Sequence, residues 1–207
     1  MRKPHPLPPL IGFAGVAGAG KDTAAKFLGV YGYRPFSFSD ALYREVADAF
    51  SVTMESLYYR ALKDAPQLEL ALARCRDDGF ICALLEAGEI ATQPAEYEKP
   101  RSPRWILQRW GTEYRRKQNP QYWIERVAED YRRRGPLMAN TSVRFQNEAE
   151  WILSERGLIF RILNDSAGCE AHVSENRLPD EMIAGEIDNN GTFEELFENI
   201  QIALDRA

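Results

Sequence analysis

The chain has 207 residues, of which 44% are hydrophobic and 28% charged, and its formal net charge is −5. These values are typical of a folded globular protein and exclude a disordered or fibrous chain. No segment approaches the roughly 20 consecutive apolar residues of a membrane helix, and no apolar signal segment follows residues 1–6. We therefore expect neither secretion nor membrane anchoring, and a cytoplasmic protein.

Charge and cysteine content limit the kinds of ligand and metal that this chain is expected to bind. Residues 99–134 carry a net charge of +7 and residues 165–207 a net charge of −9, so the middle of the chain suits an anionic ligand. Its arginines are expected on helical faces opposite glutamates and form no continuous basic strip, so we do not expect nucleic-acid binding. Three cysteines and two histidines, without a Cys-x-x-Cys pair, favour neither a structural zinc nor a disulfide framework.

The first elements follow from apolar patterns and turn residues. Residues 1–9 are rich in proline and are expected to form an extended tail. An apolar strand at residues 10–14 leads through a glycine-rich turn into a helix, and a second strand is expected at residues 35–38. Ser39 and Asp40 then provide a cap for a helix.

The rest of the chain alternates between helical and extended patterns. From about residue 40 to 135 the periodicity is helical, which indicates a large insertion. Strand patterns return at residues 137–145 and 157–163, with a helix at 148–156 between them, and an amphipathic final helix begins with a capping box at Thr192. Strands that alternate with helices favour a parallel sheet with helices on both faces. We predict one α/β domain from residue 10 to the end.

The turn after the first strand carries the pattern G-x-x-x-x-G-K. Gly15, Gly18 and Gly20 let backbone N–H groups converge on a phosphate chain, and this is the expected ATP-binding loop. Lys21 supplies a mobile cation for the β- and γ-phosphates. The dinucleotide pattern G-x-G-x-x-G is excluded because Thr23 stands where its third glycine belongs. The motif predicts a P-loop NTPase-like fold.

The residue after the P-loop lysine is unusual. Asp22 stands where Ser or Thr usually contacts Mg²⁺, and the hydroxyl follows at Thr23. A carboxylate beside a polyphosphate needs a cation between them, so we assign Asp22 to Mg²⁺ and its waters, and Thr23 to metal or phosphate. The alternative is that Asp22 only stabilises a helix N-terminus.

A helix expected after residue 103 separates an apolar face from a basic one. Guanidinium groups bind phosphate through two parallel hydrogen bonds and offset the charge on a transferring phosphoryl group. The helix therefore suits a substrate with a monophosphate, although a solvated face would show the same pattern. The basic face carries Arg109, Glu113 and Arg116, and the apolar face carries Leu107, Trp110 and Tyr114.

Short motifs along the chain match one known family in content and order. They are Gly20-Lys21-Asp22-Thr23, Arg104-Trp105-Ile106-Leu107-Gln108, Gly111-Thr112-Glu113, Tyr122-Trp123-Ile124, Val143-Arg144-Phe145-Gln146-Asn147-Glu148, His172-Val173-Ser174-Glu175 and Asp188-Asn189-Asn190-Gly191-Thr192. On these motifs the chain resembles the bacteriophage-type deoxynucleoside monophosphate kinases, within the P-loop nucleoside monophosphate kinase group.

The resemblance implies ATP- and Mg²⁺-dependent phosphorylation of a deoxynucleoside 5′-monophosphate to the diphosphate, which supplies precursors of DNA synthesis. A homodimer would be similar to relatives in this family. Trp123 would stack on the base, unless it is a core tryptophan, and Glu148 would orient Arg144 or read a polar base edge. The residues implied in phosphoryl transfer are Lys21, Arg116 and Arg144. The implied acceptor site consists of Arg104, Gln108, Glu113, Arg116, Trp123, Arg144 and Glu148.

Three further residues bear on this assignment: Ser142, His172 and Glu175. An acidic residue commonly precedes the Val-Arg pair in the family, but Ser142 stands there in this chain, which shifts the magnesium role towards Asp22 and ordered water. His172 and Glu175 precede the last strand and are candidates for a closing lid.

Two other functions fit the same pattern. A kinase of this architecture could act on a ribonucleotide, a coenzyme precursor or a sugar acid. A P-loop protein without catalytic activity could instead sense nucleotide and signal through a partner, and Ser142 is the main argument for that alternative.

Overall fold

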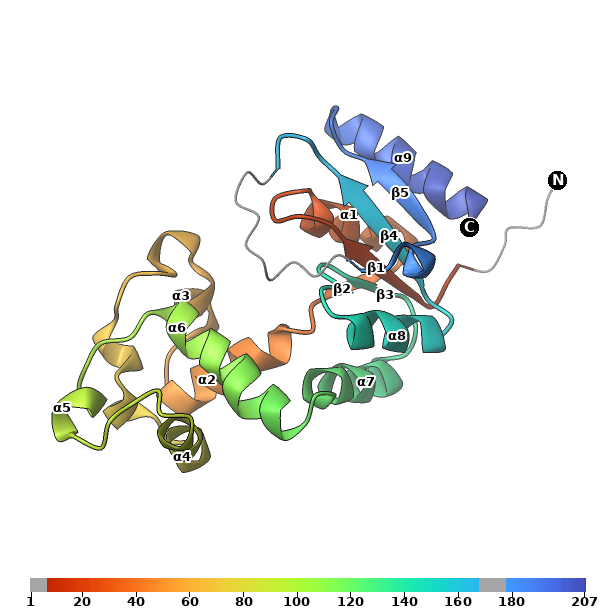
Figure 1. The fold of residues 1–207 in the computed structure, drawn as a ribbon. Helices are drawn as coiled ribbons and strands as arrows, with labels where there is room; N and C mark the ends of the chain where they lie inside the picture. Colours follow the sequence, from red (N-terminus) through yellow and green to blue (C-terminus); the bar gives the residue numbers. More distant parts are fainter. Residues whose placement is uncertain (1–6, 168–177) are drawn as a thin grey trace. The chain divides into compact units, whose positions relative to one another are not determined.

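The computed structural model describes residues 7–167 and 178–207 (Figure 1). The chain divides into two compact units: Met1–Phe38 with Val127–Ala207, called the first unit, and Ser39–Arg126, called the second unit. The second unit corresponds to most of the helical insertion expected at about residues 40–135. No helix in the described ranges is both long enough and apolar enough to cross a membrane.

The first unit is built on a parallel sheet. Its described strands are β1 (Leu10–Ala14), β2 (Arg34–Phe36), β3 (Met138–Asn140), β4 (Leu158–Leu163) and β5 (Gly185–Asp188). They lie in the order β2-β3-β1-β4-β5, and each neighbouring pair is parallel. Every residue of β1 is buried, as expected for an apolar strand in the middle of a covered sheet. The predicted α/β fold with a parallel sheet is confirmed.

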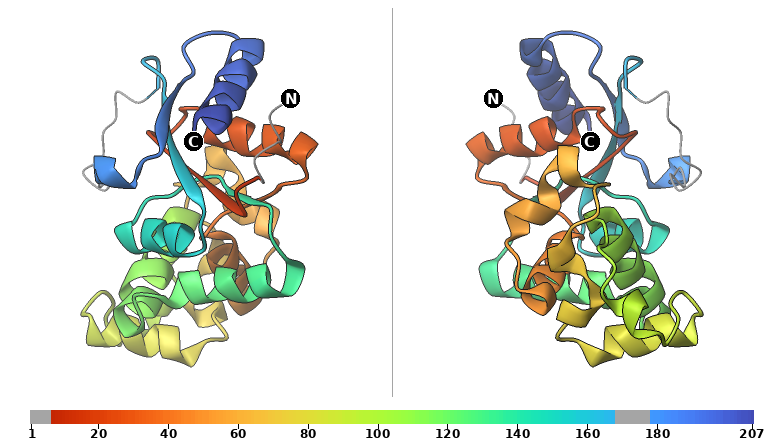
Figure 2. Two further views of the ribbon diagram at one scale, coloured as in Figure 1. Left: turned by 90° about the vertical axis from the view of Figure 1, so that its right-hand side faces the viewer. Right: turned by 90° about the vertical axis from the view of Figure 1, so that its left-hand side faces the viewer.

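Helices cover both faces of this sheet, as predicted. The helices of the first unit are α1 (Lys21–Phe27), α8 (Gln146–Ser154), α9 (Phe193–Arg206) and the 3₁₀ helices Leu28–Tyr31 and Asp180–Met182. Figure 2 shows α1 and α9 on one side of the strands and α8 on the other. The capping box is confirmed: Glu195 N–H donates to Thr192 Oγ1 at 3.2 Å, and Thr192 N–H donates to Glu195 Oε2 at 2.7 Å.

Alternation along the strands determines which side chains meet which helices. Gly12 belongs to the face that α8 covers, and a Cβ there would lie 2.7 Å from Val143 and 2.9 Å from Ile152. A glycine therefore lets α8 and the loop before it pack closely on β1. The opposite face forms a hydrophobic core with α1 and α9, which includes Ile11, Phe13, Phe160, Ile162, Ile187, Ala24, Leu196 and Ile200.

Several predicted elements have other bounds in the structure, and one predicted cap is wrong. The helix expected at residues 148–156 is Gln146–Ser154. The strand expected at residues 137–145 contains only Met138–Asn140, because the Asn140 side chain accepts the N–H of Ser142 at 2.8 Å and turns the chain. The strand expected at 35–38 is Arg34–Phe36. Ser39 directly precedes the next helix but has helical φ and ψ angles, and its side chain makes no capping hydrogen bond.

The second unit is helical. Its α-helices are α2 (Asp40–Phe50), α3 (Met54–Tyr58), α4 (Asp78–Glu86), α5 (Pro94–Tyr97), α6 (Pro103–Gln108) and the start of α7 (Tyr122–Arg134), and a π-helix spans Arg109–Arg116. Short 3₁₀ helices span Arg60–Leu62, Leu68–Leu70 and Leu72–Arg74. Cys75 and Cys82 of this unit are both free thiols.

One carboxylate joins three helices of the second unit. Glu45 of α2 accepts hydrogen bonds from Trp110 Nε1 and Arg115 Nε, each at 2.9 Å, and from the Tyr122 hydroxyl at 2.5 Å. Hydrogen bonds that involve a charged group are stronger than neutral ones. Glu45 therefore fixes the π-helix and the start of α7 against α2.

Candidate functional site

The loop between β1 and α1 has the geometry that a P-loop requires. Gly15, Gly18 and Gly20 have φ angles of 134°, 83° and 100°, which side-chain-bearing residues rarely adopt. Lys21 Nζ donates to the carbonyl oxygens of Gly15 and Val16, each at 2.6 Å. The ammonium group therefore lies over its own loop, where a bound phosphate chain would meet it. With the parallel sheet, this loop confirms the predicted P-loop NTPase-like fold.

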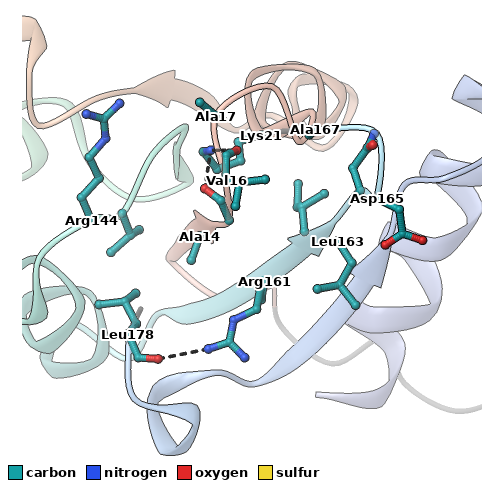
Figure 3. A pocket seen from close by; sticks show the side chains of 14 residues that line it. Ala14, Val16, Ala17, Lys21, Arg144, Arg161, Leu163, Asp165, Ala167 and Leu178 are labelled. Carbon is teal, nitrogen blue, oxygen red and sulfur yellow. Dashed lines mark hydrogen bonds between the residues drawn. The ribbon is translucent and has the colours of Figure 1, made fainter. Parts of the chain in front are cut away.

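A cavity of about 460 Å³ opens beside this loop, at the carboxyl ends of β1 and β4 (Figure 3). In parallel α/β sheets this edge is where ligands bind. Three cationic side chains line the cavity: Lys21 from the P-loop, Arg144 from the segment after β3, and Arg161 from β4. One carboxylate, Asp165, also lines it. The site therefore favours an anionic ligand.

Ser142 holds Arg144 in place. Arg144 is exposed, and its Nε donates to Ser142 Oγ at 3.0 Å. Its backbone N–H donates to Glu148 Oε2 at 3.0 Å. Ser142 itself is fixed by Asn140, as described above. The residue that departs from the family pattern therefore supports the guanidinium group instead of supplying an anion.

Glu148 acts on the backbone before α8. The residue is 2% exposed, and its Oε2 accepts the N–H groups of Arg144 and Phe145 at 3.0 Å and 3.3 Å. These two backbone contacts give no support to the expected contact with a base edge, and that role stays a prediction. The other expected role, orientation of Arg144, agrees with the contacts and operates through the backbone.

Asp22 and Thr23 lie in the first turn of α1. The Asp22 side chain is exposed and Thr23 is half-buried, and neither belongs to the residues that line the cavity. Within residues 7–167 and 178–207, no group of three or more His, Cys, Asp or Glu residues could hold a metal. Mg²⁺ needs no such group when it binds substrate phosphates and water, with one or two carboxylates from the protein.

The remaining acceptor residues belong to the second unit. Arg104 pairs with Asp64, with 2.5 Å between Nε and Oδ1 and 3.1 Å between the second nitrogen and Oδ2. The hydrogen bond from Arg104 holds the pKa of Asp64 below its ordinary value. Gln108 and Glu113 are exposed, and Arg116 is half-buried.

Trp123 does not offer a face for stacking. It is 3% exposed, and its Nε1 donates to the carbonyl oxygen of Gly111 at 3.2 Å. A ring that is buried and anchored in this way packs the interior of the second unit. This burial agrees with the core tryptophan that was the alternative expectation, and it gives no support to stacking on a base.

The helix that was expected to carry a basic face is partly a π-helix. Its apolar face is confirmed, because Leu107, Trp110 and Tyr114 are all buried. The i, i+4, i+7 alignment of the basic face is wrong, since residues 109–116 wind with i→i+5 hydrogen bonds and take more residues per turn. Arg109 also pairs with Glu89 at 2.8 Å.

Two charged residues of the cavity, Arg161 and Asp165, were not predicted from the sequence. Arg161 is the better anchored of the two in its contacts. It is 7% exposed and forms ion pairs with Asp180 at 2.8 Å and Glu186 at 3.1 Å. It also donates to the carbonyl oxygen of Leu178 at 3.0 Å, a contact drawn in Figure 3. The available signal was a single charge within the apolar strand Leu158–Leu163. His172 and Glu175, the candidate lid residues, lie outside the described residues.

Comparisons with known proteins give matches only among solved structures. The chain matches no protein-family model and no curated protein. Among solved structures it is similar to TT1252 from Thermus thermophilus, with 16% identity, a TM-score of 0.48, and coverage of 97% of this chain and 98% of that chain.

Two further similar structures are named as kinases. A gluconokinase from Sinorhizobium meliloti 1021 has 12% identity and a TM-score of 0.42, and the match covers 98% of this chain and 94% of that chain. A dephospho-CoA kinase from Campylobacter jejuni has 12% identity and a TM-score of 0.46, with 95% of each chain covered. Values this low assign neither a substrate nor residue roles.

The first prediction concerns Arg161. Arg161→Met removes the donor to the Leu178 carbonyl and both ion pairs, while Asp180 and Glu186 can be solvated because they are exposed. We expect the free energy of unfolding to fall by about 1 to 3 kcal/mol in urea denaturation. Arg132→Met, at an exposed position of α7, is the matched control. Equal stability of the two variants would contradict a structural role for Arg161.

Proposed function

We propose that the protein transfers the γ-phosphoryl group of ATP to a deoxynucleoside 5′-monophosphate. The observation that carries this proposal is the shared cavity of Lys21 and Arg144. One cation comes from the loop built for a polyphosphate, and the other comes from a different strand end. Phosphoryl transfer needs cations on both the donor and the transferring group, because charge spreads over the phosphoryl oxygens in the transition state.

Two residues of the cavity, Lys21 and Arg144, have a defined task in this reaction. Lys21 exchanges its two carbonyl contacts for the β- and γ-phosphates of ATP. Arg144, held through Ser142 and the Glu148 carboxylate, neutralises charge on the transferring group. Catalysis then consists of positioning and charge neutralisation, and requires no covalent enzyme intermediate.

The acceptor is assigned to the remaining polar residues of the implied site. Arg104, Gln108, Glu113 and Arg116 are proposed to bind the monophosphate, with Arg116 also assisting transfer. The net charge of +7 over residues 99–134 supports an anionic acceptor. Trp123 is left out of this assignment because it is buried.

The donor set beside the P-loop fits Mg²⁺. Asp22 is exposed and supplies a hard carboxylate oxygen, and Thr23 supplies a hydroxyl. When bound, Mg²⁺ would neutralise phosphate charge and orient the phosphate chain. Asp22 would hold the waters of the ion, since Ser142 cannot act as an anion.

The kinase proposal is tested with a panel of acceptors. With ATP and Mg²⁺ present, we expect ADP release to rise on addition of one or more of dAMP, dGMP, dCMP and dTMP, and Lys21→Ala to abolish the rise. Ribonucleotides, a sugar acid and a coenzyme precursor form the comparison set. If turnover occurred only with a compound of this comparison set, that compound would replace the deoxynucleoside monophosphate as the assigned acceptor. Binding of ATP without acceptor-dependent ADP release would favour the sensor function.

Arg144 is predicted to act on rate more than on stability. Arg144→Ala removes an exposed guanidinium group, so the urea midpoint should stay close to that of the wild type. We expect kcat to fall by about 100-fold or more, the usual cost of removing a group that stabilises transition-state charge. Arg132→Ala is the control for loss of an exposed arginine. Parallel losses of rate and stability would contradict the assignment.

The metal assignment is tested at Asp22. For Asp22→Asn we expect the Mg²⁺ concentration at half-maximal activity to rise by about tenfold or more, because an amide holds the ion and its waters less strongly. Asp78→Asn is the matched control, since Asp78 is an exposed acid in the first turn of α4 and belongs to the second unit, whereas the P-loop belongs to the first. If both variants lose only stability, Asp22 merely stabilises the start of its helix.

A further inference from the structure

The motif Asp188-Asn189-Asn190-Gly191-Thr192 has no task in the proposed reaction, but it contacts the P-loop. It connects β5 to α9, and Asn189 Nδ2 donates to the carbonyl oxygen of Ala19 at 2.7 Å. The two residues are 170 positions apart in the chain. Asn189 therefore joins the end of the last strand to the loop after the first.

The backbone of Asn189 is fixed on both sides. Its N–H donates to the carbonyl oxygen of Leu163 at 2.8 Å, and its carbonyl oxygen accepts from Asn164 Nδ2 at 2.8 Å. The next residue, Asn190, accepts the N–H of Asp165 at 2.8 Å. These contacts come from the end of β4 and the loop after it. They hold the backbone of Asn189 in place, so its side-chain amide has a fixed position beside the P-loop.

Asn189 and Gly20 fit one another closely. A Cβ at Gly20 would lie 2.3 Å from Asn189 Nδ2, which is far inside normal contact. Gly20 also has a φ angle of 100°, so a side chain there would be strained in any case. The Asn189 amide thus occupies the space next to a P-loop glycine and closes that side of the loop.

We propose that Asn189 is a positioning residue that orients the Ala19–Gly20 peptide for polyphosphate binding. The peptide group is planar and trans, so its C=O and N–H point in opposite directions. When Asn189 holds the Ala19 carbonyl on one side, the Gly20 N–H is turned to the other side, towards the concave face of the loop. This inference rests on the nucleotide-binding part of the proposed function and adds a residue that acts through the P-loop backbone.

The test compares two variants of Asn189 with one matched control. Asn189→Ala removes the amide, and Asn189→Asp keeps its shape but replaces the donor with an acceptor. Asn199→Ala removes the hydrogen bond from Asn199 to the Asp188 carbonyl oxygen, 3.0 Å long, which belongs to the same turn but not to the P-loop. We expect both Asn189 variants to bind ADP about tenfold more weakly in calorimetry, and the control to bind as the wild type does.

Steady-state kinetics separate positioning from general damage. We expect KM for ATP to rise in both Asn189 variants while KM for the acceptor is unchanged. Wild-type ADP affinity in both variants would overturn the inference, and so would weaker binding in Asn189→Asp alone, since that result reflects only the added charge. If neither variant folds, Asn189→Ser replaces the amide with a shorter side chain that cannot span the same distance to Ala19, and unchanged ADP affinity there would overturn the inference.

The same measurements distinguish the two proposals. A wild-type protein that binds ADP but shows no acceptor-dependent turnover would contradict the kinase function. Weaker ADP binding by both Asn189 variants would still support the positioning role in that case.

Discussion

The sharp return of the chain after β1 is the constraint on which the site depends. Strand β1 is buried along its whole length and ends in a loop whose φ angles at Gly15, Gly18 and Gly20 are rarely adopted by residues with a Cβ. A Cβ at Gly15 would also lie 2.6 Å from the carbonyl oxygen of Ile162. The close approach of β4 to the loop therefore requires a glycine at position 15.

Asparagine side chains end the strands that surround this loop. Asn140 accepts the N–H of Ser142 after β3, and Asn164 accepts the N–H of Ser166 at 2.9 Å after β4. Such contacts replace the ladder hydrogen bonds that the sheet no longer supplies, and they direct the chain away from it. The loops of the cavity are thus shaped by short side-chain hydrogen bonds more than by packing.

The sequence was sufficient for features that depend on local patterns. The apolar run of β1, the glycine motif and the capping box at Thr192 each involve residues a few positions apart, and all three are present as predicted. The length of β3 was not predictable from hydrophobicity, because a single Asn140 contact ends a run that still looks extended.

Side-chain roles at the site were harder to predict than the elements that carry them. A tryptophan that stacks on a base and a tryptophan that fills a core have the same neighbours in sequence. The burial of Trp123 is therefore visible only in the folded chain. Arg161 depends on partners contributed by a different segment, Asp180 and Glu186, and no local pattern joins them. The arginine in an apolar strand was the one visible sign of that contact.

Because Gly20 and Asn189 fit closely, a substitution at either position affects the other, although the two are far apart in the chain. A residue other than glycine at position 20 would be strained by the φ angle of 100° and would also meet the Asn189 amide, so a smaller residue at position 189 would relieve only the contact. A chimera that joined the first part of this chain to the last part of another protein would keep the P-loop motif intact in sequence. It would lose the donor to the Ala19 carbonyl unless the second parent supplied an amide at the position of Asn189.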